Sequence, residues 1–131
     1  MTARRQQPTG PVTPLEYATI VADAMSEATF QAQLDGLGAD LGWLCYHTHD
    51  SRGSQRGFLD WVAVRGDRLV LAEIKVQSES RGCVTADQQR WIDRLTALRD
   101  ETEHVYGSCP VEVYLWRPLD ITTDTIARIL Q

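Results

Sequence analysis

Long hydrophobic runs are the first feature that this chain of 131 residues lacks. No apolar stretch approaches the roughly 18–20 residues that a membrane-spanning helix needs. Residues 1–14 contain Arg4 and Arg5 but no apolar segment of the kind that a secretory signal requires. We therefore expect a cytoplasmic protein that does not contact a membrane.

Cysteine is also scarce, with Cys45, Cys83 and Cys109 widely spaced and odd in number. This pattern excludes a disulfide framework, and the absence of a C-x-x-C pair argues against structural zinc. We expect small buried thiols in a reducing compartment. His47 and His49 form an H-x-H pair, but no further ligands stand at zinc spacing, so we interpret both as packed or loop residues. His47 remains a candidate for a phosphate contact.

An excess of positive charge is missing too, because 13 basic residues stand against 18 acidic ones and the net charge is −5. This balance argues against a protein that coats nucleic acid by bulk electrostatics. It leaves open an enzyme whose acidic side chains hold cations and whose nucleic-acid contacts come from a local basic patch. The candidates for that patch are Arg52, Arg56, Arg81, Arg90 and Arg94.

The composition, 43% hydrophobic and 24% charged, is that of one globular domain. Residues 1–13 are rich in proline, threonine and glutamine, and we expect them to be disordered at least in part. Residues 14–131 are expected to form a single domain without internal repeats.

Two helices are predicted first. Thr13-Pro14-Leu15-Glu16 is a capping box with proline at the first helical position, and it opens a helix to about Met25. Ser26 can cap a second helix, which Gly42 ends. The second helix carries an apolar stripe on one face, made of Phe30, Leu34, Leu37 and Leu41.

Three short strands are predicted next, over Trp43–His47, Phe58–Arg65 and Arg68–Val76, with polar loops over 48–57 and 77–84. The dipeptide Gly66-Asp67 between two β-forming runs is a strong hairpin signal.

A second capping box, Thr85 to Gln88, predicts a helix. Val111–Trp116 is the fourth predicted strand, and Thr122–Leu130 is a closing helix. This order predicts an α/β fold with a mixed four-stranded sheet flanked by helices. The inner face of the long helix is expected to present Trp91, Ile92, Leu95 and Leu98.

The hairpin brings chemically active side chains together. Alternate strand residues share a face, so Glu73 and Lys75 point the same way from an otherwise apolar strand, where charges are costly to bury. Antiparallel pairing across Gly66-Asp67 places Asp60 within about one residue of Glu73 in register. Two neighbouring carboxylates favour a hard cation such as Mg²⁺ or Mn²⁺. Lys75 could orient or deprotonate an attacking water, or stabilise charge on a phosphate in the transition state.

Four motifs stand along the chain: Gly57-Phe58-Leu59-Asp60, Ala72-Glu73-Ile74-Lys75, Thr85-x-x-Gln88-x-x-Trp91 and Trp116-Arg117-Pro118. Together they resemble the VRR-NUC (virus-type replication-repair nuclease) group of PD-(D/E)XK nucleases. The N-terminal part of that group is also similar to this chain at Ser26-Glu27, Phe30, Gly42-Trp43, Tyr46-His47 and Asp50-Ser51. The resemblance covers about residues 26–130. It implies the restriction-endonuclease-like fold, and a source in a bacterial cell or a phage-infected host.

The resemblance also implies a role for individual residues. Asp60, Glu73 and the backbone carbonyl of Ile74 would hold the metal, with Lys75 as the catalytic lysine. Gln88 would point at the active centre from its helix, and Glu27 would be an acid from the helix after Ser26. One residue departs from the family pattern: Leu59 stands where the family has proline, which shapes the backbone and binds no metal.

Structural alternatives stand beside these roles. An E-x-K tripeptide alone is common by chance, and its position on an apolar strand opposite Asp60 is what favours the nuclease interpretation. Gln88 also completes a capping box, and Glu27 is a first-turn acid that complements the helix dipole. Base stacking is the minority interpretation for the tryptophans. We expect all four to lie in the core: Trp43, Trp61, Trp91 and Trp116.

The sequence therefore predicts a divalent-metal-dependent endonuclease without a small-molecule cofactor. The resemblance implies structured or branched DNA, such as Holliday junctions, as substrate, and a homodimer, since cutting two strands takes two active sites. The predicted DNA contacts are Arg52, Arg56, Arg81 and Arg90. A catalytically inactive DNA-binding or phage assembly module on the same fold is the alternative. A serine or cysteine hydrolase has little support, because the chain has no Gly-x-Ser-x-Gly motif.

Overall fold

The computed structural model describes residues 10–48 and 52–131. It confirms an α/β fold with a mixed four-stranded sheet flanked by helices. The predicted disorder of residues 1–13 falls mostly outside the described residues. The elements are α1 (Pro14–Ala24), α2 (Glu27–Asp40), β1 (Leu44–His47), β2 (Trp61–Arg65), β3 (Arg68–Ile74), α3 (Ala86–Tyr106), β4 (Val111–Trp116), α4 (Pro118–Thr122) and α5 (Thr125–Leu130).

The sheet has the strand order β1-β2-β3-β4. β1, β2 and β3 pair antiparallel, and β4 lies parallel to β3. The hairpin between β2 and β3 has the predicted two-residue turn, with Arg65 opposite Arg68. Gly66 sits there at a φ of 58°, a conformation that glycine adopts at little cost. Because the turn has two residues, the register along the whole hairpin follows, and Trp61 lies opposite Ala72.

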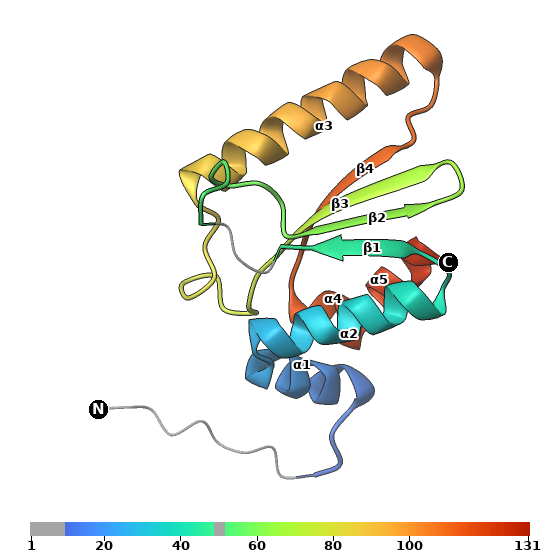
Figure 1. Ribbon diagram of the computed structural model, residues 1–131. Coiled ribbons are helices and arrows are strands. Elements are labelled where there is room, and N and C mark those ends of the chain that lie inside the picture. The colour runs from blue at the N-terminus through green and yellow to red at the C-terminus, as the bar shows by residue number, and fades with distance from the viewer. Residues whose placement is uncertain (1–9, 49–51) are drawn as a thin grey trace.

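The core lies against one face of the sheet. Figure 1 shows α1, α2, α4 and α5 on that side, and α3 alone on the other. Trp61, Ala63, Val70, Ala72 and Ile74 alternate toward the four-helix side and are fully buried. Their partners in the core include Phe30, Leu34, Ile126 and Leu130.

Both predicted capping boxes are present. The Thr13 side chain accepts a hydrogen bond from the Glu16 amide at the start of α1, and the Thr85 side chain accepts one from the Gln88 amide at the start of α3. Ser26 caps α2 in the same way, through the Thr29 amide. These local signals were readable because a capping box is contained within four consecutive residues.

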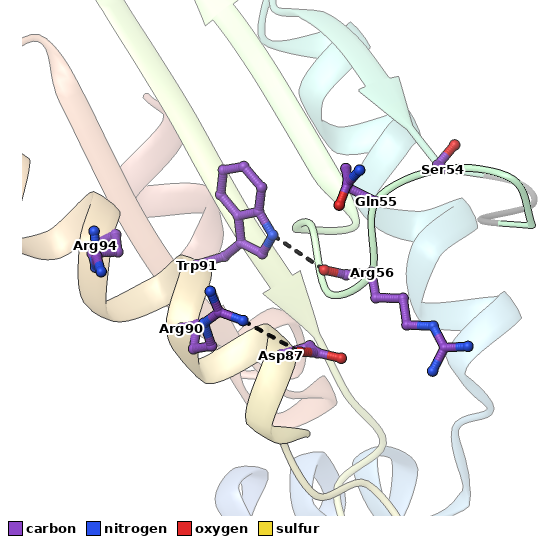
Figure 2. A pocket seen from close by; sticks show the side chains of 7 residues that line it. All are labelled: Ser54, Gln55, Arg56, Asp87, Arg90, Trp91 and Arg94. Carbon is purple, nitrogen blue, oxygen red and sulfur yellow. Dashed lines mark hydrogen bonds and ion pairs between the residues drawn. The ribbon is translucent and has the colours of Figure 1, made fainter.

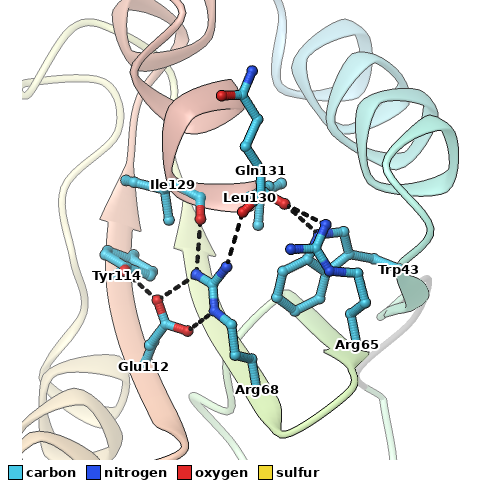
Figure 3. Close-up of polar contacts among 8 residues, drawn as sticks. All are labelled: Trp43, Arg65, Arg68, Glu112, Tyr114, Ile129, Leu130 and Gln131. Carbon is cyan, nitrogen blue, oxygen red and sulfur yellow. Dashed lines mark hydrogen bonds and ion pairs between the residues drawn. The ribbon is translucent and has the colours of Figure 1, made fainter.

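An arginine and tryptophan cluster fastens the turn end of the hairpin to α5 (Figure 3). The Trp43 indole donates a hydrogen bond of 2.8 Å to the Leu130 carbonyl, and the guanidinium groups of Arg65 and Arg68 lie 4.8 and 5.0 Å from its ring centre. Arg68 also forms a two-pronged ion pair with Glu112, at 2.7 and 2.8 Å. Arg65 and Arg68 bind carbonyl oxygens at the end of α5, so this end of the hairpin is structural.

Two predicted elements differ clearly from the structure. β2 begins at Trp61 rather than at Phe58, because residues before Trp61 leave the ladder and turn toward α3. The closing helix predicted over Thr122–Leu130 is two short helices, since Pro118 starts α4 early and Asp124, at a φ of 60°, separates α4 from α5. Pro118 stands at the first position of α4, where proline is a common helix start signal.

The packing of α3 also differs from expectation, because none of its residues is buried. Leu98, predicted to face inward, is 56% exposed, and Trp91 is only partly buried. The other three tryptophans are in the core, as predicted. The cysteines are free, but the expectation of buried thiols was wrong: Cys83 is exposed, and Cys45 and Cys109 are partly buried. No helix in the described ranges has the length and apolar character to cross a membrane.

Candidate active site

Asp60 and Glu73 face each other at the open end of the hairpin. Asp60 directly precedes β2, and continuing the register one step beyond the pair Trp61 and Ala72 places it opposite Glu73. Its Oδ2 accepts a hydrogen bond of 3.2 Å from the Ile74 amide, which fixes the carboxyl against β3. The structure therefore brings together the two predicted acids.

The Glu73 carboxyl is buried, with one oxygen occupied and the other not. Its side chain has 0% exposure. Oε1 accepts a hydrogen bond of 2.7 Å from Gln88 Nε2 and lies 3.4 Å from Lys75 Nζ. Oε2 is buried and has no hydrogen-bond partner within residues 10–48 and 52–131. A carboxylate oxygen without a partner is costly to bury unless something positive reaches it.

Burial and the facing acid keep a proton in this site when no cation is bound. Desolvation, followed by the close approach and charge repulsion of Asp60, raises the pKa of Glu73 to about 8. Lys75 lowers the pKa of Glu73 but does not offset the effects of burial and of Asp60. The two carboxyls thus favour a shared positive charge between them.

Lys75 follows β3 directly and shares a face with Glu73. Its amide donates to the Trp116 carbonyl at 3.0 Å, which continues the β3–β4 ladder and holds the lysine backbone in line. The side chain is only 13% exposed. The ammonium group is therefore held beside the two acids, where the sequence places it.

Gln88 makes contacts on both sides that were considered from the sequence, with the cap of α3 and with the candidate site. Its Oε1 accepts from the Thr85 amide at 2.9 Å and completes the capping box. Its Nε2 donates to Glu73 at 2.7 Å, so the opposite side of the same amide orients the buried acid. The first turn of α3 is thereby tied to the strand that carries Glu73 and Lys75.

The charges of the site also act on Glu27, the first residue of α2. Burial and then the charge of Asp60 raise the pKa of Glu27, whereas Lys75 lowers it. Glu27 is nevertheless an exposed residue at the start of α2. Its function at the site stays a prediction.

The donor set fits a hard divalent cation. The site offers two neighbouring carboxyls and the partnerless Oε2 of Glu73. The Ile74 amide points to Asp60, and in an extended strand the carbonyl of the same residue points to the same edge. Asp60, Glu73 and the Ile74 carbonyl are therefore the residues that would hold the metal. No group of three or more His, Cys, Asp or Glu side chains gathers at metal-binding spacing among the described residues. Mg²⁺ usually keeps several waters in protein sites.

Beside this site, a loop and α3 enclose a cleft of about 750 Å³. Figure 2 shows its walls: residues 54–56 on the loop side, and Asp87, Arg90, Trp91 and Arg94 on the helix. We call it the arginine cleft. Arg56 and Arg90, both predicted to contact DNA, share it, whereas Arg52 and Arg81 are exposed on loops outside its walls.

Gly57 lets the loop approach α3 closely, and no sequence motif predicts this contact. A Cβ built on Gly57 would clash with the backbone carbon of Asp87, and the φ of Gly57 is 85°. Only glycine allows so close an approach in this conformation. Trp91 completes the contact, since its indole donates to the Arg56 carbonyl at 3.2 Å and meets the Phe58 ring edge-on, with ring centres 5.0 Å apart.

His47 is a packed residue at the end of β1. Its Nε2 lies 3.5 Å from Asp35 Oδ2, and Asp35 also accepts a hydrogen bond of 3.0 Å from the Trp61 indole. His49 lies outside the described residues.

Comparison of the chain with models of protein families, with curated proteins and with solved structures finds no match in any of the three.

Proposed function

We propose that this protein is a divalent-metal-dependent nuclease of the PD-(D/E)XK type that hydrolyses phosphodiester bonds in DNA. The observation that carries the proposal is the cluster of Asp60, Glu73 and Lys75 at one end of a hairpin, with Glu73 fully buried. Burying a carboxyl that lacks a partner for one oxygen weakens the fold, and perturbed acids of this kind gather at functional sites. A cation and a phosphate together would satisfy all three side chains.

Each side chain has a distinct part in the chemistry. A bound Mg²⁺ or Mn²⁺ would supply a more acidic water and neutralise charge on the phosphate. Asp60, Glu73 and the Ile74 carbonyl hold that cation. Lys75 places an ammonium group where it can orient the attacking water or stabilise the charge of the transition state. Gln88 keeps Glu73 in position through its 2.7 Å hydrogen bond.

The hydrolysis itself is a displacement at phosphorus. A water oxygen forms a new bond to phosphorus, the bond to one ester oxygen breaks, and that oxygen leaves as the hydroxyl end of one fragment after taking up a proton. Glu27 adds negative charge at the edge of the site and is proposed to hold waters there. Structured or branched DNA as the preferred substrate, and a homodimer as the active form, are further parts of this proposal; sedimentation of the purified protein tests the dimer.

Cleavage assays test the proposal. Purified protein is incubated with branched and linear DNA in Mg²⁺ or Mn²⁺, beside the variants Asp60→Ala and Glu73→Gln. Both variants should lose at least about a hundredfold in rate, the scale of losing a main electrostatic contributor. Asp67→Asn is the matched control, since it removes an exposed acid at the other end of the same hairpin. Absence of cutting on every substrate, or undiminished cutting by Asp60→Ala, would refute the proposal.

A DNA-binding or phage assembly module without catalysis remains the alternative. It would bind DNA and leave it intact in both metals. Leu59, which stands where the resembling family has proline, does not favour that alternative, because it is fully buried and packs as an ordinary core residue directly before Asp60.

A further inference from the structure

The arginine cleft has the chemistry of a polyanion site in a protein that is acidic overall. Arg56, Arg90 and Arg94 line it, against the single acid Asp87, whereas the whole chain has a net charge of −5. Neither Arg56 nor Arg94 has a carboxylate within ion-pair distance in the part of the chain that the structure describes. Uncompensated guanidinium groups gathered in a concave surface attract phosphates.

The one acid in the cleft does not neutralise it. Arg90 and Asp87 lie 3.9 Å apart, with side chains 81% and 48% exposed. An ion pair so exposed and so long contributes little to stability, so the Arg90 guanidinium can turn to a phosphate at small cost.

Two segments of the chain join the cleft to the candidate active site. Asp87 lines the cleft, and Gln88, which follows it directly, donates a hydrogen bond to Glu73 of the site. On the loop side, Arg56 lines the cleft and Asp60 follows it four residues later. A strand whose phosphodiester lies at Asp60 and Glu73 would therefore have its neighbouring nucleotides close to the cleft.

The size and walls of the cleft favour an unpaired strand. A volume of about 750 Å³ is in the range of sites for small organic ligands, and it can take a nucleotide whose base has left the stack. A base paired within a duplex cannot reach such a pocket. Trp91 supplies an aromatic wall, which its hydrogen bond to the Arg56 carbonyl and its ring contact with Phe58 hold in place. The face of an indole ring can stack on any base.

We propose that the arginine cleft binds a single-stranded segment of the nucleic-acid substrate next to the scissile phosphate. Arg90 and Arg94 hold successive phosphates, and a base lies against Trp91. This inference rests on the proposed nuclease function and narrows its substrate class to DNA with an unpaired stretch beside the cut.

Binding without cleavage tests the inference. A fluorescein-labelled thymidine oligonucleotide is titrated with protein in EDTA, and anisotropy reports binding. Arg90→Ala and Arg94→Ala should each lose about fivefold in affinity at about 0.1 M salt, and the salt slope should fall by about 0.7 for each phosphate contact removed. Arg99→Ala on the same helix, outside the cleft, is the matched control and should bind like the unmodified protein.

A blunt duplex of equal length should compete poorly with the oligonucleotide. Unchanged affinity in Arg90→Ala and Arg94→Ala, or equally strong and equally affected duplex binding, overturns the inference. The two proposals fail separately. If the protein binds the single strand through the arginines but never cuts DNA, only the nuclease function is refuted. If the protein cuts DNA but binds the single strand equally well without either arginine, only this inference is refuted.

Discussion

Gln88 and Glu73 are joined by a hydrogen bond of 2.7 Å from the glutamine Nε2 to the buried Oε1. The other end of the same amide accepts from the Thr85 amide at the start of α3. One side chain therefore serves the stability of a helix and the orientation of a candidate metal ligand, and the two roles can be separated by substitution.

Thr85→Ala and Gln88→Glu should have opposite effects on stability and on DNA cleavage. Thr85→Ala removes the hydroxyl cap and should lower the free energy of unfolding by about 1 kcal/mol while leaving cleavage intact. Gln88→Glu keeps an oxygen for the Thr85 amide but sets a second carboxylate against Glu73, so stability should change less and cleavage should fall. Chemical denaturation and a cleavage assay on both variants check this. If Gln88→Glu cuts normally, Gln88 is only a cap.

Glu73 should make the metal-free protein less stable as the pH rises. Its pKa is raised from the unfolded value of 4.5 to about 8, so between these values the unfolded state releases a proton that the folded state keeps. The free energy of unfolding should then fall by more than about 1.4 kcal/mol, the equivalent of one pKa unit, and level off above pH 8. The difference between the unmodified protein and Glu73→Gln, measured in EDTA across this range, isolates the effect. A difference that does not vary with pH contradicts the assignment.

Glu112 should show the opposite dependence on pH. The hydrogen bond and charge of Arg68 lower its pKa below the ordinary value of 4.5. Its contribution is therefore complete above that value and is lost as the pH falls through the lowered pKa. Glu112→Gln should cost about 1–3 kcal/mol at neutral pH, the scale of hydrogen bonds to charged groups, and should not change cleavage. Denaturation curves at neutral and acid pH test this; an equal loss at both refutes it.

Gly57 and Gly53 form a matched pair for the contact between the loop and α3. Both have a positive φ, 85° and 83°, but a Cβ on Gly53 would meet nothing within 4 Å, whereas one on Gly57 would meet the Asp87 backbone. Gly53→Ala should therefore cost only the strain of the left-handed conformation, about 1–2 kcal/mol at most. Gly57→Ala should cost more and should also weaken oligonucleotide binding. Thermal unfolding and anisotropy compare the two, and similar results for both would count against the contact.

The sheet and the acid pair were predictable because their signals are local. Gly66-Asp67 sets a two-residue turn, and once the turn is known every pairing follows, including Asp60 opposite Glu73. The capping boxes at Thr13 and Thr85 were readable for the same reason.

The arginine cleft was not predictable, because it depends on how a loop meets a helix about thirty residues later in the chain. Its one local sign is Gly57, and a glycine in a polar loop has many uses. The helical spacing of Trp91 with Leu95 and Leu98 predicts that Trp91 lies in the core. Spacing identifies the side of a helix that faces the protein, but it does not say how much of that side the protein covers.

Calorimetric titration with Mn²⁺ tests the central claim most directly, because it asks whether the carboxyls of Asp60 and Glu73 hold a cation. The unmodified protein should give a saturable binding heat. Its affinity for Mn²⁺ should weaken as the pH falls below about 8, because the proton on Glu73 then competes with the metal. Asp60→Asn and Glu73→Gln should abolish this heat, and Asp67→Asn should preserve it. A protein that binds no Mn²⁺, or binds it equally well without Glu73, contradicts the account.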